Sequence, residues 1–287
     1  MSATIHDGGR PFLPPGVVTL IEATLGAGLD AFGADPIPVI GQAPGFNGLP
    51  LAAIRLDRGA LVRARNDWLE ALRLVVSNMH ADMLFSVFGA YELARVTQPD
   101  GVSAWGPVFF FFGDASTWND PADPRVVSLG ADDLAEVDYK RFWHCYDGEA
   151  HEGYGVIEDG ELVALAGVLH FSDGVEEIGM DVMPEARGHG LGRAVVGAAG
   201  TAIIERGNLA LATTSPWNVP SARTLRSAGL RYSYTQMMSF DGFEGAFPMP
   251  AQPLGRPFPG ARNLANFRGS TGLNTSTWMG RGPGRAG

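Results

Sequence analysis

A glycine-rich loop between a short strand and an amphipathic helix constrains the fold of this chain more than any other segment. The loop is Arg187-Gly-His-Gly-Leu-Gly-Arg193, and the strand before it ends near Val182. Glycines let the backbone approach a ligand closely. A helix N-terminus offers unpaired N–H groups and a partial positive charge. The segment therefore predicts a strand–loop–helix unit that binds a phosphate or pyrophosphate, with Arg187 and Arg193 able to pair with the same anion.

Two common nucleotide-binding motifs do not fit this loop. A P-loop requires Lys and then Ser or Thr after its last glycine, whereas Gly192 is followed by Arg193 and Ala194. A dinucleotide-binding loop requires an acidic residue about 20 positions later, at the end of the next strand. The next apolar run, residues 209–214, contains no acidic residue. The loop therefore needs a third interpretation.

The spacing Arg187-x-x-Gly190-x-Gly192 resembles the signature of the GNAT superfamily of acyl-CoA-dependent N-acyltransferases. A second segment agrees with it. Asn218-Val-Pro-Ser221 and the later Gly229-Leu230 are similar to the family's Asn-x-x-Ser/Ala helix, which closes with Gly-Phe/Leu eleven positions after the Asn. The resemblance covers about residues 125–240 and implies an α/β (α+β) fold. That fold has a mixed, mostly antiparallel, splayed central sheet flanked by helices.

The residues before the loop agree with this fold. Residues 156–163 have the pattern of a β-hairpin with an Asp-Gly turn, and residues 170–178 have the pattern of a second hairpin. We therefore expect a meander of strands that leads into the loop and its helix.

The resemblance also implies how acetyl-CoA is held as a co-substrate. Backbone groups of the strand would bond the pantetheine, and a strand N–H near Asp181 would face the thioester oxygen. The loop N–H groups from His189 to Arg193 would bind the pyrophosphate. The cofactor-binding residues expected from this comparison are Met180, Asp181, Val182, Arg187, Gly188, His189, Gly190, Leu191, Gly192, Arg193, Asn218 and Ser221.

Acyl transfer to an amine needs a general base, donors for the developing oxyanion and a proton for the leaving thiolate. Members of the family often place a glutamate base where Glu176 and Glu177 begin the strand, and Glu176 stands at the spacing expected for it. Adjacent strand residues point to opposite faces, so at most one of the two faces the site. The alternative is that both are solvated hairpin residues.

The general acid is less well defined. Many family members carry a tyrosine seven positions after the Asn, and that position is Leu225 here. Ser221 is our catalytic candidate beside the two glutamates, and Ser215, Tyr232 and Tyr234 are alternatives. The alternative to all four is that the thiolate leaves unassisted.

Two functions from different classes fit these residues. The first is an acetyl-CoA-dependent N-acetyltransferase, an enzyme that acetylates a primary amine of a small molecule or an exposed protein amine. The second is a non-catalytic CoA-binding module that serves regulation or assembly, which Leu225 favours. Removing both glutamates separates them, because an enzyme would lose turnover and keep CoA affinity.

Composition excludes several other classes. The net charge of −10 disfavours a nucleic-acid partner and suits either a cationic amine or simple solubility. No apolar run reaches the roughly 18 residues of a membrane span, and the N-terminus lacks the apolar core of a signal peptide. We therefore expect a cytoplasmic protein, as a homodimer. The six histidines and Cys145 show no metal-ligand spacing, so no metal site is expected.

The rest of the chain divides by composition. Residues 1–122 are expected to be an additional α/β domain, either a degenerate GNAT-like half or a cap, with helices at 17–32, 61–76 and 84–96, a buried strand at 108–112 and an irregular loop at 33–50. A Pro-rich linker at 120–124 precedes the catalytic domain at 125–240. Residues 245–287 form a Gly/Pro/Arg-rich extension with five arginines and no acidic residue.

Overall fold

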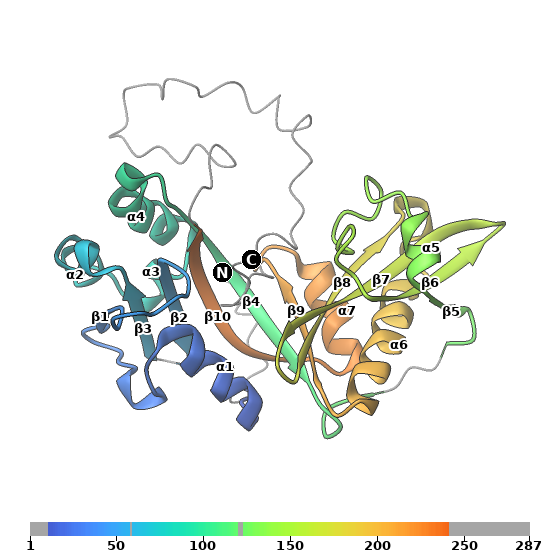
Figure 1. Cartoon of the computed structure of the whole chain (residues 1–287), viewed down its shortest axis with the longest axis horizontal. Helices are drawn as coiled ribbons and strands as arrows, with labels where there is room; N and C mark the ends of the chain where they lie inside the picture. The colour runs from blue at the N-terminus through green and yellow to red at the C-terminus, as the bar shows by residue number, and fades with distance from the viewer. Residues whose placement is uncertain (1–10, 58, 120–122, 241–287) are drawn as a thin grey trace. The chain divides into compact units, whose positions relative to one another are not determined.

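The computed structural model describes residues 11–57, 59–119 and 123–240, which form two compact units (Figure 1). Unit 1 contains the described residues up to Phe109 and those from Ser233 onward, and unit 2 contains Phe110–Tyr232. Two strands, β4 (Ser103–Gly113) and β10 (Arg231–Phe240), run from one unit into the other. The predicted domains 1–122 and 125–240 stay a prediction, and the linker residues 120–122 and the extension 245–287 lie outside the described residues.

Unit 1 combines short helices with a small sheet. Its strands follow the order β1-β3-β2-β10, with β1 and β3 parallel and the other pairs antiparallel. Helix α1 packs on β2, and α2 packs on β1 and α4. The elements are α1 (Pro15–Leu25), η1 (Leu29–Ala31), β1 (Val39–Gly41), β2 (Leu51–Leu56), β3 (Gly59–Ala64), η2 (Asn66–Trp68), α2 (Leu69–Val76), α3 (Ala81–Leu84), α4 (Val87–Thr97) and η3 (Gln98–Asp100), besides parts of β4 and β10.

Unit 1 differs from the predicted helices in two places. The helix expected at 61–76 is wrong in its first part, because residues 59–64 form β3 and only residues 69–76 are α-helical. β3 pairs on both edges, with β1 and β2, and this pairing overrides the local helical period. The helix expected at 17–32 ends at Leu25, where Gly26 adopts a φ of 64°. The helix at 84–96 and the strand at 108–112 are confirmed by α4 and β4, and β1 interrupts the loop expected at 33–50.

Unit 2 is a mixed, mostly antiparallel sheet with helices on both faces, as predicted. Its strands follow the order β9-β8-β7-β6-β5, and only β8 and β9 are parallel. Helix α6 lies along β6, β7 and β8 (Figure 1). The elements are β5 (Val126–Leu129), α5 (Ala131–Ala135), β6 (Glu152–Glu158), β7 (Glu161–Ser172), β8 (Val175–Val182), η4 (Pro184–Ala186), α6 (Leu191–Glu205), β9 (Leu209–Thr214) and α7 (Val219–Ala228).

Both predicted hairpins are confirmed. β6 and β7 join through Asp159 and Gly160, with φ values of 51° and 82°, and β7 and β8 join through Asp173 and Gly174. The strand predicted at 209–214 is β9.

A row of three glycines crosses the sheet of unit 2. Gly153 on β6 pairs with Gly167 on β7, which pairs with Gly179 on β8. A Cβ at Gly167 would collide with the carbonyl oxygen of Cys145, and a Cβ at Gly179 would collide with that of His144. The missing side chains therefore let the segment 144–146 lie directly on the strands, on the face opposite α6.

None of the helices in the described residues is long and apolar enough to cross a membrane. No group of three or more His, Cys, Asp or Glu side chains among these residues is placed to hold a metal ion.

Candidate functional site

The glycine-rich loop has the geometry of an anion site. Gly188 and Gly190 adopt φ values of 85° and 79°, which favour glycine, and Gly190 is the N-cap of α6. A Cβ at either position would meet no described atom within 4 Å, so the outer side of the loop is open. The N–H groups of Leu191, Gly192 and Arg193 begin the helix and have no acceptor within it. These N–H groups and the helix dipole favour a bound phosphate.

The third glycine of the loop serves packing. A Cβ at Gly192 would stand 3.3 to 3.4 Å from the side chains of Thr224, Met180 and Val182. Gly192 therefore lets the first turn of α6 fit between β8 and α7, and this contact fixes where the loop N–H groups point.

The two arginines that flank the loop stand in different positions. The Arg187 Nε donates to the carbonyl oxygen of Val182 at 3.1 Å, so its side chain folds back toward the end of β8. Arg193 lies in the first turn of α6 and is exposed. His189 is also exposed, and its Nδ1 lies 3.3 Å from the carbonyl oxygen of Ala186. The loop therefore combines N–H groups with two cationic side chains at one end of α6.

β8 and β9 separate directly before the loop. They pair at three positions, from Val175 with Leu209 to Glu177 with Leu211, although β8 continues to Val182 and β9 to Thr214. Beyond Glu177, the β9-facing edge of β8 has no strand partner among the described residues. A separation of this kind leaves backbone groups free to bond an extended ligand such as pantetheine.

Glu177 lies where the strands begin to separate, and none of it is exposed. The Thr213 hydroxyl donates to its Oε1 at 3.1 Å, while its Oε2 has no hydrogen-bond partner. Burial raises the pKa of Glu177 to about 7, although the Thr213 and Tyr146 hydroxyls act in the opposite direction. A carboxyl group that titrates near neutral pH suits general acid–base chemistry.

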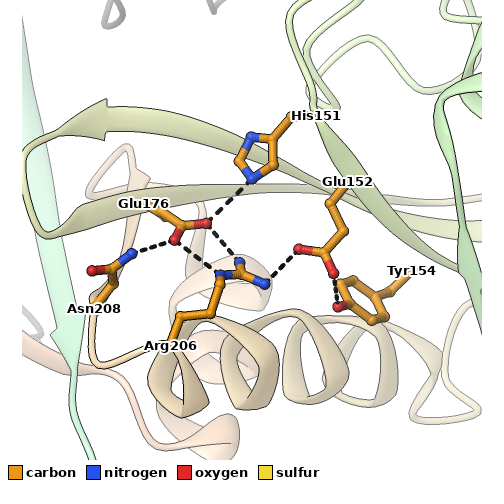
Figure 2. A network of polar contacts seen from close by, with 6 residues as sticks. All are labelled: His151, Glu152, Tyr154, Glu176, Arg206 and Asn208. Carbon is orange, nitrogen blue, oxygen red and sulfur yellow. Dashed lines mark hydrogen bonds and ion pairs between the residues drawn. The ribbon is translucent and has the colours of Figure 1, made fainter.

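Glu176 points to the other face of β8 and is fully engaged there (Figure 2). Arg206 donates to both carboxylate oxygens, at 3.2 and 2.7 Å, and Asn208 Nδ2 donates to Oε1 at 2.5 Å. His151 Nε2 lies 3.3 Å from Oε2. Burial favours the neutral acid, but the hydrogen bonds from Arg206 and Asn208 outweigh burial and lower the pKa of Glu176. Glu176 is therefore held as a charged structural group.

Arg206 connects several elements of unit 2 at the C-terminal end of α6 (Figure 2). Besides Glu176 on β8, its Nη1 pairs with Glu152 on β6 at 2.9 Å, and Glu152 also accepts a hydrogen bond from Tyr154. The hydrogen bonds that Arg206 donates to Glu176 raise the pKa of Arg206 further. This network fixes the start of β8, where Glu177 is the next residue.

A second pair lies further along the Glu177 face of β8. Asp181 Oδ2 accepts a hydrogen bond from the backbone N–H of His144 at 2.8 Å, and Asp181 Oδ1 lies 2.7 Å from His144 Nδ1. Cys145 follows, buried, with its Sγ 3.4 Å from the carbonyl oxygen of Leu165; burial raises the pKa of this thiol well above its usual value. The sequence analysis did not bring His144 and Asp181 together. The sequence did contain one indication of this pair: Asp181 is an acidic residue on the Glu177 face of β8, at the strand position next to the expected thioester.

The segment that resembles the family's Asn-x-x-Ser helix forms α7. Asn218 caps this helix, because its side chain accepts a hydrogen bond from the Ser221 N–H at 3.3 Å. Leu225 is buried on the inner side of α7 and Tyr234 is buried in β10. Trp118 packs on α6 with its Nε1 3.0 Å from Thr201 Oγ1, whereas Trp143 and Trp217 are exposed.

Comparison with known proteins identifies this unit. Residues 116–230, which lie within unit 2, match the model of the Acetyltransferase (GNAT) family. This segment is therefore similar to the GNAT acetyltransferases, and the reaction of that family is acyl transfer. A comparison with curated proteins finds no match.

Solved structures similar to this chain include three bacterial proteins. A putative GNAT acetyltransferase from Novosphingobium aromaticivorans is 22% identical over 48% of this chain and 66% of its own, with a TM-score of 0.41. A GCN5-related N-acetyltransferase from Kribbella flavida is 20% identical over 52% of this chain and 63% of its own, with a TM-score of 0.38. A GNAT acetyltransferase from Colwellia psychrerythraea is 15% identical over 48% of this chain and 57% of its own, with a TM-score of 0.39. This chain thus spans less than two thirds of the length of each of these three proteins.

Proposed function

We propose that this protein transfers an acetyl group from acetyl-CoA to a primary amine of a small molecule or of an exposed protein segment. The observation that carries the proposal is Glu177, a buried carboxyl group with a pKa of about 7 at the point where β8 and β9 separate. A carboxylate there can accept the proton that an amine loses as it attacks a thioester held between the strands.

The residues present fit acetyl-CoA as the acyl donor. The N–H groups of Leu191, Gly192 and Arg193 would bind the pyrophosphate together with Arg187, and the free edge of β8 would bond the pantetheine amides. The strand groups concerned are those of Met180, Asp181 and Val182. Gly188, His189 and Gly190 would shape the loop, and Asn218 and Ser221 would border the site from the start of α7.

Between the two glutamates, we propose Glu177 as the base. Glu176 accepts hydrogen bonds from Arg206 and Asn208 and stands beside His151, so its oxygens are occupied. Glu177 keeps one oxygen without a partner. Ser221 would then be a group of the cofactor site, since its N–H already serves the cap of α7.

The test starts with binding. Isothermal titration of the full chain with acetyl-CoA should give an affinity in the micromolar range, and the double variant Arg187→Ala/Gly190→Trp should abolish it. Turnover is then measured as CoA release with spermidine, tyramine and a lysine-containing peptide as acceptors. An absence of binding by the wild-type chain at millimolar acetyl-CoA would refute the proposal.

The alternative is a non-catalytic CoA-binding module for regulation or assembly. Leu225 supports it, because a buried leucine stands where many family members carry the tyrosine acid. The two functions separate in the Glu177→Gln variant. An enzyme loses turnover at unchanged acetyl-CoA affinity, whereas a binding module shows no turnover with any of the three acceptors in either form. A homodimer and a cytoplasmic location stay predictions.

A further inference from the structure

His144 is held at two points by a single carboxylate. Asp181 accepts from the His144 backbone N–H at 2.8 Å and contacts the ring Nδ1 at 2.7 Å. The Trp143 ring stacks on the imidazole, with 3.4 Å between the ring centroids and 33° between the planes. The position of the ring is therefore fixed from its backbone, from Nδ1 and from one face.

This arrangement leaves the other ring nitrogen available. No described residue gives a hydrogen bond to His144 Nε2, and the side chain is 37% exposed. A carboxylate on Nδ1 orients the imidazole ring. Histidine in this setting can donate a proton from Nε2 and regain it from solvent.

The pair stands on the strand segment near Asp181 where the resemblance to the GNAT family places the thioester oxygen. Asp181 is four residues after Glu177 on β8, on the same face, with Gly179 between them. The carbonyl oxygen of His144 lies against Gly179, so the segment 143–146 covers this stretch of β8. β8 has already separated from β9 here.

Acyl transfer needs a proton donor that the family motif does not supply in this chain. Leu225 occupies the tyrosine position and has no proton to give. Tyr146 is the other group close to Glu177, but it is buried, and burial raises its pKa well above the usual value. His144 is the partly exposed candidate on this face.

Resting on the proposed function, we propose that His144 is the catalytic acid that protonates the departing CoA thiolate from Nε2, and that Asp181 is its positioning residue. The neutral amine nitrogen attacks the thioester carbon, and a C–N bond forms. The C–S bond then breaks, and its electron pair leaves on sulfur. The sulfur takes the proton from His144 Nε2, and Glu177 takes the proton that the nitrogen loses. Solvent then returns a proton to His144 and removes the one on Glu177.

The experiment compares two acyl donors. His144→Asn keeps a donor at the Nδ1 position for Asp181 and removes Nε2. With acetyl-CoA its kcat should fall about 100-fold at unchanged acetyl-CoA affinity. With para-nitrophenyl thioacetate, whose aryl thiolate leaves without a proton, variant and wild type should react at similar rates. His170→Asn, on the exposed side of β7, is the matched control and should behave as wild type with both donors.

Two further variants test the roles. His144→Ala should regain activity toward acetyl-CoA when imidazole is added, which a structural role would not allow. The kcat of Asp181→Asn should fall less than that of His144→Asn, and the loss should again be seen with acetyl-CoA and not with para-nitrophenyl thioacetate. If Tyr146→Phe, and not His144→Asn, shows the donor-dependent loss, the acid is Tyr146 and the proposal is overturned.

The failures can be told apart. If wild type turns over amines and His144→Asn keeps its kcat, or loses it equally with both donors, His144 is not the acid while the acetyltransferase function stands. If wild type releases no CoA with spermidine, tyramine or the lysine peptide, the proposed function fails and this proposal fails with it.

Discussion

Glu176 and Glu177 are neighbours in the chain but lie on opposite faces of β8 in opposite charge environments. Arg206 and Asn208 bind Glu176 and lower its pKa, whereas burial raises the pKa of Glu177 to about 7. The alternation of a strand thus assigns a structural role to one carboxylate and leaves the other for chemistry.

The buried Glu177 should make stability depend on pH. Its pKa is raised from 4.5 to about 7 in the folded state, so the folded protein binds more protons than the unfolded chain between these values. Protonation of Glu177 therefore stabilises the folded state by on the order of 3 kcal/mol below about pH 4.5, and this contribution is lost as pH rises through 7. Urea unfolding of wild type and Glu177→Gln at pH 5 and pH 8 measures this difference. Equal pH dependence in the two proteins would contradict it.

The same group should control the pH dependence of turnover. As a base Glu177 must be ionised, so kcat/KM should increase as pH rises through about 7. Glu177→Gln should lose about 100-fold in kcat. Glu176→Gln should keep the wild-type pH profile, because Glu176 faces α6. If the turnover of the Glu176→Gln protein no longer varied with pH, the assignment of Glu177 as the base would be contradicted.

Arg206 should matter for stability more than a surface cation does. Arg206→Met leaves Glu176, which is 4% exposed, without its main counter-charge. We expect a loss of about 2 kcal/mol, and the double variant Glu176→Gln/Arg206→Met should recover part of it, because no charge is then left buried. Thermal unfolding of the wild type, the two single variants and the double variant gives the coupling free energy between Glu176 and Arg206. Additive effects would show that the ion pair contributes nothing.

The glycine row should not tolerate a methyl group. Gly179→Ala would drive a Cβ into the His144 carbonyl oxygen and should destabilise the protein by about 2 kcal/mol. It should also displace His144 from Asp181. Gly130→Ala is the control, because the nearest atom to a Cβ there is 3.9 Å away and its φ of −84° suits alanine. Chemical unfolding of both variants tests the difference, and a Gly179→Ala protein as stable as the control would show that segment 143–146 moves aside at little cost.

Local patterns were enough to predict the part of the fold that carries the loop. The two hairpins, β9 and the capped helix α7 follow from turn residues, alternation and an Asn before Pro220, all of which act within a few residues. The signature at Arg187, Gly190 and Gly192 indicated the family for the same reason.

Contacts between distant segments could not be predicted in this way. β3 has a helical period and becomes a strand because β1 and β2 pair with it. The choice between Glu176 and Glu177 depends on Arg206 and Thr213, which lie 30 and 36 positions away in sequence. The pair His144–Asp181 spans 37 positions and depends on the room left at Gly179.

The pairing of β10 with β2 places a strand from late in the chain next to one from its beginning. During synthesis the ribosome releases Leu51–Leu56 early and Arg231–Phe240 only after all of unit 2. Until then β2 has one open edge, and open edges pair readily with other chains. Unit 1 can complete its sheet only after unit 2 has been made. A fragment that ends at Leu230 would contain all residues matched to the family and would still lack this strand.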